Sequence, residues 1–262
     1  MDRNIPNQAE AGVALRDEMP TGLPLQALPM FFFIHVPKTG GTSLNTVLHE
    51  MFFPFSIYHG QISEQAGGNG NIAHFLSTRP SFYDHLLLVV GHFAWRHPLV
   101  HAVKRRRIIL SVMRNPIDRI VSLYDYMRLQ DDHPQNSTLR NMSLREAINE
   151  SSRFRSHCEN AQLQTIFGTR DEKEAQKRLR QEHYVLGQFD HLPRFIQAVE
   201  NVSGLKRRSD LQQLNSKPAT LPILRAREQP DFQAAIADLH RMNAAEMEFF
   251  AKMPPILATV AA

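Results

Sequence analysis

The stretch FFFIHVPKTGGTSLNTVLHEMFF, residues 31–53, joins an apolar run to a helical pattern through a short turn with two glycines. The run at 30–36 is continuously apolar, which is typical of a strand buried on both faces of a parallel sheet. After the turn, apolar side chains recur at helical spacing: Leu44, Val47, Leu48 and Met51. The sequence therefore predicts a strand, a tight turn and a helix over 42–52 in direct succession.

Two further apolar runs, 86–92 and 107–113, have the character of the first. Asn115 and Pro116 follow the last run, and an N-cap residue before proline predicts a helix from there to about Arg128. Strands that alternate with helices predict an α/β fold of three layers, α/β/α, with a central parallel sheet and helical additions. Ligands of such sheets bind at the carboxyl ends of the strands.

The second half of the chain is expected to be mainly helical. Ser143 and Glu146 form an S-x-x-E capping box that opens a helix. Further patterns predict helices over 156–182 and 229–251, a late strand over 183–189 and an irregular loop over 205–225. Residues 1–28 contain prolines and no sustained period, so we expect a flexible N-terminal arm before a single domain at 29–262.

Composition limits the class of protein. The 262 residues are 42% hydrophobic and 21% charged, as in ordinary globular proteins. A formal charge of +4 favours a local basic site for an anion and argues against a nucleic-acid binder. No apolar run is long enough for a membrane span, and the N-terminus has no apolar signal segment. With one cysteine, Cys158, expected to be a buried thiol, the chain predicts a cytoplasmic protein.

The turn after the first strand has the chemistry of an oxyanion cradle. Unpaired N–H groups at the start of a helix point toward a bound phosphate or sulfate, and the helix dipole favours negative charge there. Lysine adds a full positive charge, glycines allow close approach of the backbone, and hydroxyls offer further donors. The candidate ligand-binding residues of the turn are Lys38, Thr39, Gly40, Gly41, Thr42 and Ser43.

This turn differs from the usual nucleotide loop, G-x-x-x-x-G-K-[ST], because its lysine precedes the glycines. The segment HVPKTGGTS, residues 35–43, instead resembles the 5′-phosphosulfate loop of the sulfotransferases that use 3′-phosphoadenosine 5′-phosphosulfate. The similarity is to the carbohydrate-type family that includes the heparan and uronyl 2-O-sulfotransferases. The resemblance implies a P-loop-like version of the predicted fold.

Two further fragments resemble the same family, in the same order. RIILSVMRNPIDRIVSLYDYMR, residues 107–128, is similar to the segment that binds the 3′-phosphate of the donor, which implies that role for Arg114 and Ser122. VVGHFAWRHPL, residues 89–99, is similar to the segment of the catalytic histidine, here His92. Weaker similarity over 184–199 extends the resemblance to most of residues 30–250. The stretch at 130–182 matches poorly, and we expect this stretch to determine which acceptor the protein uses.

The resemblance implies transfer of a sulfuryl group from 3′-phosphoadenosine 5′-phosphosulfate to an acceptor hydroxyl, less favourably an amine, by direct in-line displacement. His92 fits the base, Lys38 the stabiliser of the leaving group, and the backbone at 39–43 the oxyanion donors. The leaving nucleotide phosphate is of low basicity, so no metal is expected. The expected partners are the nucleotide donor and a carbohydrate, glycoconjugate or small-molecule acceptor.

Several alternatives stay open from the residues alone. A P-loop kinase-like phosphotransferase would share the fold but require Mg²⁺, and a catalytically silent nucleotide-binding protein would not need His92. Arg119 could contact the donor or pair with a carboxylate such as Asp118 or Asp125. Three further features are expected to be structural: His35, the pair His97 and His101, which lacks a third metal ligand, and the basic run 104–107, which could also contact an anionic acceptor.

Overall fold

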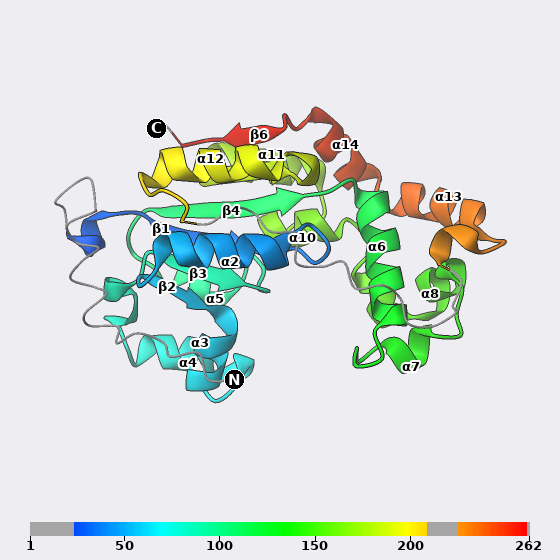
Figure 1. Ribbon diagram of the computed structural model, residues 1–262, viewed down its shortest axis with the longest axis horizontal. Coiled ribbons are helices and arrows are strands. Elements are labelled where there is room, and N and C mark those ends of the chain that lie inside the picture. The colour runs from blue at the N-terminus through cyan, green and yellow to red at the C-terminus, as the bar shows by residue number, and fades with distance from the viewer. Residues whose placement is uncertain (1–23, 209–224, 261–262) are drawn as a thin grey trace.

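The computed structural model describes residues 24–208 and 225–260, so the expected arm at 1–28 and loop at 205–225 fall largely outside the described residues. A six-stranded sheet with the order β2-β3-β1-β4-β5-β6 forms the centre (Figure 1). Neighbouring strands are parallel except β5 and β6. The strands are β1 (Met30–Ile34), β2 (Ser56–Tyr58), β3 (Leu88–Gly91), β4 (Arg107–Met113), β5 (His183–Gln188) and β6 (Ile256–Ala258).

Helices connect and cover these strands. The α-helices of the described residues are α2 (Gly41–Phe52), α3 (His59–Gln65), α4 (Ile72–Ser77), α5 (Pro98–His101), α6 (Pro116–Leu129), α7 (Asn136–Leu139), α8 (Leu144–Glu150), α9 (Ser152–Ser156), α10 (Ala161–Phe167), α11 (Glu172–Gln181), α12 (Leu192–Ser203), α13 (Phe232–Met242) and α14 (Ala244–Lys252). Within 24–208 and 225–260, no helix has the length and apolar character needed to cross a bilayer.

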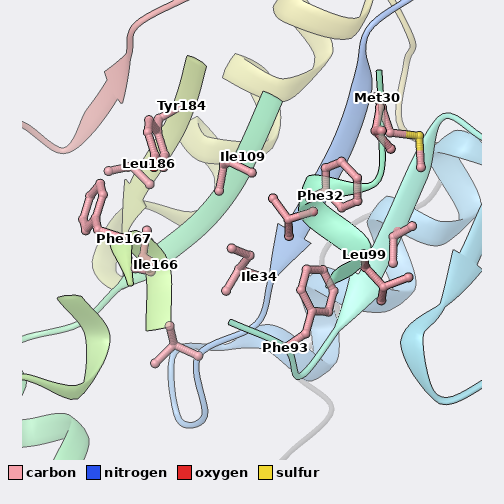
Figure 2. Close-up of a cluster of buried hydrophobic side chains, with 14 of the residues drawn as sticks. Met30, Phe32, Ile34, Phe93, Leu99, Ile109, Ile166, Phe167, Tyr184 and Leu186 are labelled. Atoms are coloured by element: carbon pink, nitrogen blue, oxygen red, sulfur yellow. The ribbon is translucent and has the colours of Figure 1, made fainter. Parts of the chain in front are cut away.

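Side chains alternate between the two faces of the buried strands, and this alternation builds the layers. Phe31 and Phe33 of β1 belong to one apolar cluster, which α2 and α12 cover. Phe32 and Ile34 point to the opposite face, where they share a second cluster with residues of α10, α11 and α14 (Figure 2). Both faces of β1 are therefore buried, and the predicted three-layer α/β fold with a mostly parallel sheet is confirmed.

A third apolar cluster lies beyond the sheet. Helix α6 starts at the carboxyl end of β4 and runs out of the sheet region to pack with α7, α8 and α13 (Figure 1). Its buried side chains include Ile120 and Tyr124, which join Leu144 of α8 and Leu239 of α13. These helices are the helical additions that the sequence predicts.

The predicted helix starts are confirmed in detail. The Asn115 side chain accepts from the N–H groups of Ile117 and Asp118 at 3.0 and 3.2 Å, with Pro116 opening α6. Ser143 and Glu146 form the expected capping box of α8. Strand β1 ends at Ile34, two residues before the end of the run 30–36, and β3 (Leu88–Gly91) is shorter than the run 86–92 at both ends. The three-residue strands β2 and β6 carry no periodic signal and were not predicted.

Candidate functional site

The strand order places the three family-like fragments side by side. β1 lies between β3 and β4 and is parallel to both, so the carboxyl ends of all three strands meet at one edge of the sheet. His92 directly follows β3, the turn of Lys38 follows β1, and Arg114 directly follows β4. The chemistry-bearing residues at the strand ends are therefore brought to one edge, as ligand sites in such sheets require.

The turn between β1 and α2 is tight and internally bonded. Lys38 and Gly40 have φ values of 70° and 79°, in the left-handed region that favours glycine. The buried Thr39 hydroxyl donates to the Val36 carbonyl oxygen at 2.8 Å and thus holds the turn together. Its hydroxyl is used within the protein, which leaves only its backbone for a ligand.

Gly41 has a second reason to be glycine. A Cβ atom at this position would lie 1.8 Å from the imidazole of His35, a distance that no packing can accommodate. The His35 ring therefore determines how closely the first turn of α2 approaches the end of β1. Gly41, Thr42 and Ser43 begin α2, at the positive end of the helix dipole.

Two cations of the site lie against aromatic rings. The Lys38 ammonium is 4.3 Å from the centroid of the Tyr126 ring, and the Arg114 guanidinium carbon is 4.6 Å from that of Phe189. Arg114 also donates from Nη1 to the Lys38 carbonyl oxygen at 3.3 Å. Burial, and secondarily the charge of Arg114, lower the pKa of Lys38. Two positive charges held this close favour an anion between them.

A pocket of about 450 Å³ opens between the turn and helix α6. Lys38, Arg114 and Ser122, which the sequence assigns to two separate motifs, line it together. The other lining residues are Asp118, Val121, Asp125, Tyr126, Leu129, Gln130, Asp132, Arg225 and Arg227. The cationic residues from three distant parts of the chain and the ring of Tyr126 suit a nucleotide phosphate and an aromatic base.

Sequence analysis did not single out Tyr126, Arg225 or Arg227. Tyr126 follows Ser122 by one helical turn, so a helical projection of α6 could have placed it on the same face. Arg227 reaches α6 from 109 residues away through an ion pair with Asp118 at 3.0 Å. Such a contact depends on tertiary packing and leaves no local pattern in the sequence.

His92 is held in the form that a base requires. Its Nδ1 lies 3.2 Å from the His35 carbonyl oxygen. A carbonyl can only accept a hydrogen bond, so Nδ1 carries the proton and Nε2 has a free lone pair. The ring stacks on that of His35, with centroids 4.1 Å apart, and its partial burial there lowers its pKa. The side chain is nevertheless accessible to solvent, so the neutral imidazole can meet an acceptor.

Arg119 is buried, and the carboxylate that acts on it is not one of the two examples considered from the sequence. Its side chain is 1% exposed, does not line the pocket, and donates from Nη2 to the His157 carbonyl oxygen at 2.6 Å. Asp118 pairs with Arg227, and Asp125 accepts from the backbone N–H of Ala226 at 2.9 Å. Among the charges that act on Arg119, the buried carboxylate of Glu246 has the largest effect. The helical periodicity of α6 turns Arg119 inward, away from its acidic sequence neighbours.

His97 and His101 both have structural contacts. His97 Nδ1 accepts from the N–H of Leu99 and caps α5, while His101 Nε2 donates to the Trp95 carbonyl oxygen at 2.8 Å. Among the residues that the structure describes, no three His, Cys, Asp or Glu side chains are grouped to hold a metal ion.

The basic run 104–107 lies at the amino end of β4, the edge of the sheet opposite His92. Arg105 donates to the carbonyl oxygens of Leu25 and Leu86, and Arg107 donates to that of Val100 at 3.2 Å. These contacts with backbone carbonyl oxygens favour the interpretation of the run as a strand entrance.

Comparison with known proteins gives distant similarities. No family model matches the chain. In sequence it is distantly similar to heparan sulfate 2-O-sulfotransferases, which confirms the resemblance seen in the motifs. Heparan sulfate 2-O-sulfotransferase 1 of Homo sapiens is 25% identical over 115 residues, which is 40% of this chain and 31% of the relative. Heparin sulfate O-sulfotransferase of Drosophila melanogaster is 25% identical over 112 residues, 38% of this chain and 30% of the relative.

The chain thus matches less than a third of the length of these relatives, and the match is narrower than the resemblance over 30–250 expected from the motifs. Among solved structures, a sulfotransferase from Alicyclobacillus acidocaldarius aligns with a TM-score of 0.46 and 16% identity, covering 85% of this chain and 96% of that one. Mouse sulfotransferase SULT7A1 complexed with PAP aligns with a TM-score of 0.41 and 12% identity, covering 90% of this chain and 74% of that one.

The burial of His35 predicts a pH dependence of stability. Burial, followed by the charges of His92 and Lys38, lowers the pKa of His35 from 6.5 to about 3. Between these values the unfolded chain binds a proton that the folded protein does not, so stability falls as pH decreases. Acidification from pH 7.5 to pH 5.5 should cost about 1.4 kcal/mol through this residue. Urea unfolding of the wild type and of His35→Asn at both pH values measures the difference.

The matched control is His74→Asn, which removes an imidazole from the exposed side of α4 and should retain the pH dependence of the wild type. If His35→Asn shows the same loss of stability on acidification as the wild type, the neutral buried state of His35 is wrong.

Proposed function

We propose that this protein is an enzyme that transfers the sulfuryl group of 3′-phosphoadenosine 5′-phosphosulfate to a hydroxyl of an acceptor. The observation that supports this proposal most directly is the pocket shared by Lys38, Arg114 and Ser122. The first residue belongs to the phosphosulfate-like motif and the other two to the 3′-phosphate-like motif. Lys38 and Arg114 are 76 residues apart in sequence and nevertheless joined by a hydrogen bond, so the two half-sites face one ligand.

The turn and the start of α2 would bind the phosphosulfate end of the donor. The backbone of Gly40 and Gly41, the hydroxyls of Thr42 and Ser43 and the Lys38 ammonium offer positive potential to the oxygens of the transferring group. As the sulfur–oxygen bond to the 5′-phosphate breaks, negative charge collects on the leaving phosphate oxygen. Lys38 is the cation positioned to stabilise that charge, and burial, followed by the charge of Arg114, lowers its pKa.

His92 would act as the base. Its Nε2 takes the proton of the acceptor hydroxyl while the acceptor oxygen forms its bond to sulfur and the donor phosphate departs on the opposite side. The hydrogen bond from Nδ1 to the His35 carbonyl oxygen, which fixes the tautomer, also stabilises the ring once it is protonated. The chemistry needs no metal in this scheme, because the leaving phosphate is weakly basic and the loop supplies the positive charge.

A carbohydrate or glycoconjugate hydroxyl is our proposed acceptor, supported by the relatives, whose names specify heparan or heparin sulfate. A single domain at 29–262 and a cytoplasmic location complete the proposal. The thiol of Cys158 is buried, and its burial raises the pKa to about 12, consistent with an inert group.

The deciding experiment is a labelled-sulfate transfer assay with the purified protein, 3′-phosphoadenosine 5′-phosphosulfate carrying the label, and a mixed extract of glycans and small metabolites. We expect label in acceptor products at nearly the same rate with and without a chelator. Activity that chelation abolishes and Mg²⁺ restores would support a kinase-like phosphotransferase instead. Tight binding of the donor without any transfer would support a silent nucleotide-binding protein.

Arg114→Ala should weaken binding of 3′-phosphoadenosine 5′-phosphate much more than binding of adenosine 5′-phosphate, which lacks the 3′-phosphate. The lost charge-assisted contact corresponds to roughly 1.5–3 kcal/mol. Calorimetry with both nucleotides measures the two losses, and Arg106→Ala, an exposed arginine at the far edge of the sheet, is the matched control. An equal loss for both nucleotides would remove Arg114 from the 3′-phosphate site.

His92→Ala should lower turnover on the order of 10²–10⁴-fold while donor affinity stays close to that of the wild type. The reason is that the His92 ring lies outside the pocket that holds the nucleotide residues. Melting temperature, donor titration and initial rate are measured on one preparation. A stable variant with full activity would disprove the role, and a joint loss of stability and donor binding would show that His92 is a structural residue.

A further inference from the structure

The backbone of Arg114 is held by a glutamine from a distant part of the chain. Gln162 of α10 donates from Nε2 to the Arg114 carbonyl oxygen at 2.8 Å and accepts from the Arg114 N–H at 3.0 Å. The ladder between β4 and β5 ends one residue earlier, at Met113. The side-chain amide of Gln162 therefore holds the backbone of Arg114 directly after the last residue that the sheet hydrogen bonds hold.

Glu246 of α14 sets the orientation of this amide. Its Oε1 accepts from Gln162 Nε2 at 2.7 Å, and its Oε2 accepts from the Gln162 backbone N–H at 2.8 Å. A reversed amide would direct the Gln162 oxygen toward both the carboxylate and the Arg114 carbonyl, with no hydrogen between these acceptors. Only one orientation is favourable, and it is the one that binds both backbone groups of Arg114.

The support behind Gln162 is itself rigid. Gln162 and Glu246 are fully buried, and the Glu246 N–H donates to the Asn160 side chain at 2.9 Å. The buried cation of Arg119 acts on the Glu246 carboxylate from α6. A buried carboxylate with hydrogen bonds and a compensating cation resists rearrangement, because separating the groups would leave a charge uncompensated. Helices α6, α10 and α14 are thus locked together behind the end of β4.

We propose that Gln162 is a positioning residue of the nucleotide site: it fixes the backbone from which Arg114 reaches the 3′-phosphate and thereby sets the preference for nucleotides that carry this phosphate. The inference rests on the proposed function. The strength of a charge-assisted hydrogen bond depends steeply on the positions of its two groups, and a displacement of about 1 Å weakens binding considerably. Part of the poorly matched stretch 130–182 therefore serves donor binding, where the sequence predicted only acceptor choice.

The test measures the affinities of 3′-phosphoadenosine 5′-phosphate and adenosine 5′-phosphate for the full chain by calorimetry. Gln162→Met keeps the volume of the side chain and removes both hydrogen bonds to Arg114. We expect the ratio of the two affinities to fall about 10-fold, mainly through the nucleotide that carries the 3′-phosphate. A purely structural role would lower the melting temperature and leave this ratio unchanged.

Gln229→Met is the matched control. Gln229 is also a buried glutamine. It accepts from the Leu144 N–H and donates to the Tyr124 hydroxyl, both at 2.7 Å, and both partners belong to the third apolar cluster. This variant should keep the ratio of the wild type. If Gln162→Met does not fold, Gln162→Asn, which retains the amide but shortens it by one methylene, is measured with the same expected fall.

Two results would overturn the inference alone: an unchanged ratio in the Gln162 variant, or an equal fall in Gln229→Met. A wild-type protein that binds both nucleotides equally, or neither, would instead contradict the proposed function itself.

Discussion

His35, the residue directly after β1, contacts both the candidate base and the anion-binding turn. The His35 N–H donates to the Gly91 carbonyl oxygen at 2.9 Å and thus joins the end of β1 to the end of β3. Its own carbonyl oxygen accepts from the His92 ring, and its imidazole occupies the space that a side chain at Gly41 would need. One residue therefore connects the candidate base, the anion-binding turn and the sheet. A shift of His35 would displace all three together.

Much of this arrangement could be predicted from local sequence. The apolar runs, the Asn115-Pro116 helix start and the S-x-x-E capping box are local signals, and the corresponding elements formed where expected. The parallel orientation of the sheet was also predicted, and it places the carboxyl ends of neighbouring strands at one edge. The motif residues could be recognised because their fragments resemble the family, and because the turn of Lys38 follows β1 and Arg114 directly follows β4.

Other features could not be predicted because they depend on contacts between distant segments. For Arg119 the sequence left open a contact with the donor or a pairing with a carboxylate such as Asp118 or Asp125, whereas its environment is formed by His157 and Glu246. The sequence interpretation of Gly41 as a residue that admits an anion missed the His35 ring packed against it. In each case the deciding partner becomes a neighbour only through the tertiary fold. The burial of the Arg119 side chain becomes visible only in the tertiary structure.

The conformation of Lys38 bears on which residues can occupy this position. Its φ of 70° lies in a region where glycine, asparagine and aspartate are favoured, and other residues incur a local strain of about 1–2 kcal/mol. None of the three favoured residues carries a positive charge. Replacement of Lys38 by glycine, asparagine or aspartate would therefore relieve the backbone strain of the turn but remove the positive charge. Replacement by arginine would keep both the charge and the strain. Selection for stability and selection for charge act in opposite directions on this one residue.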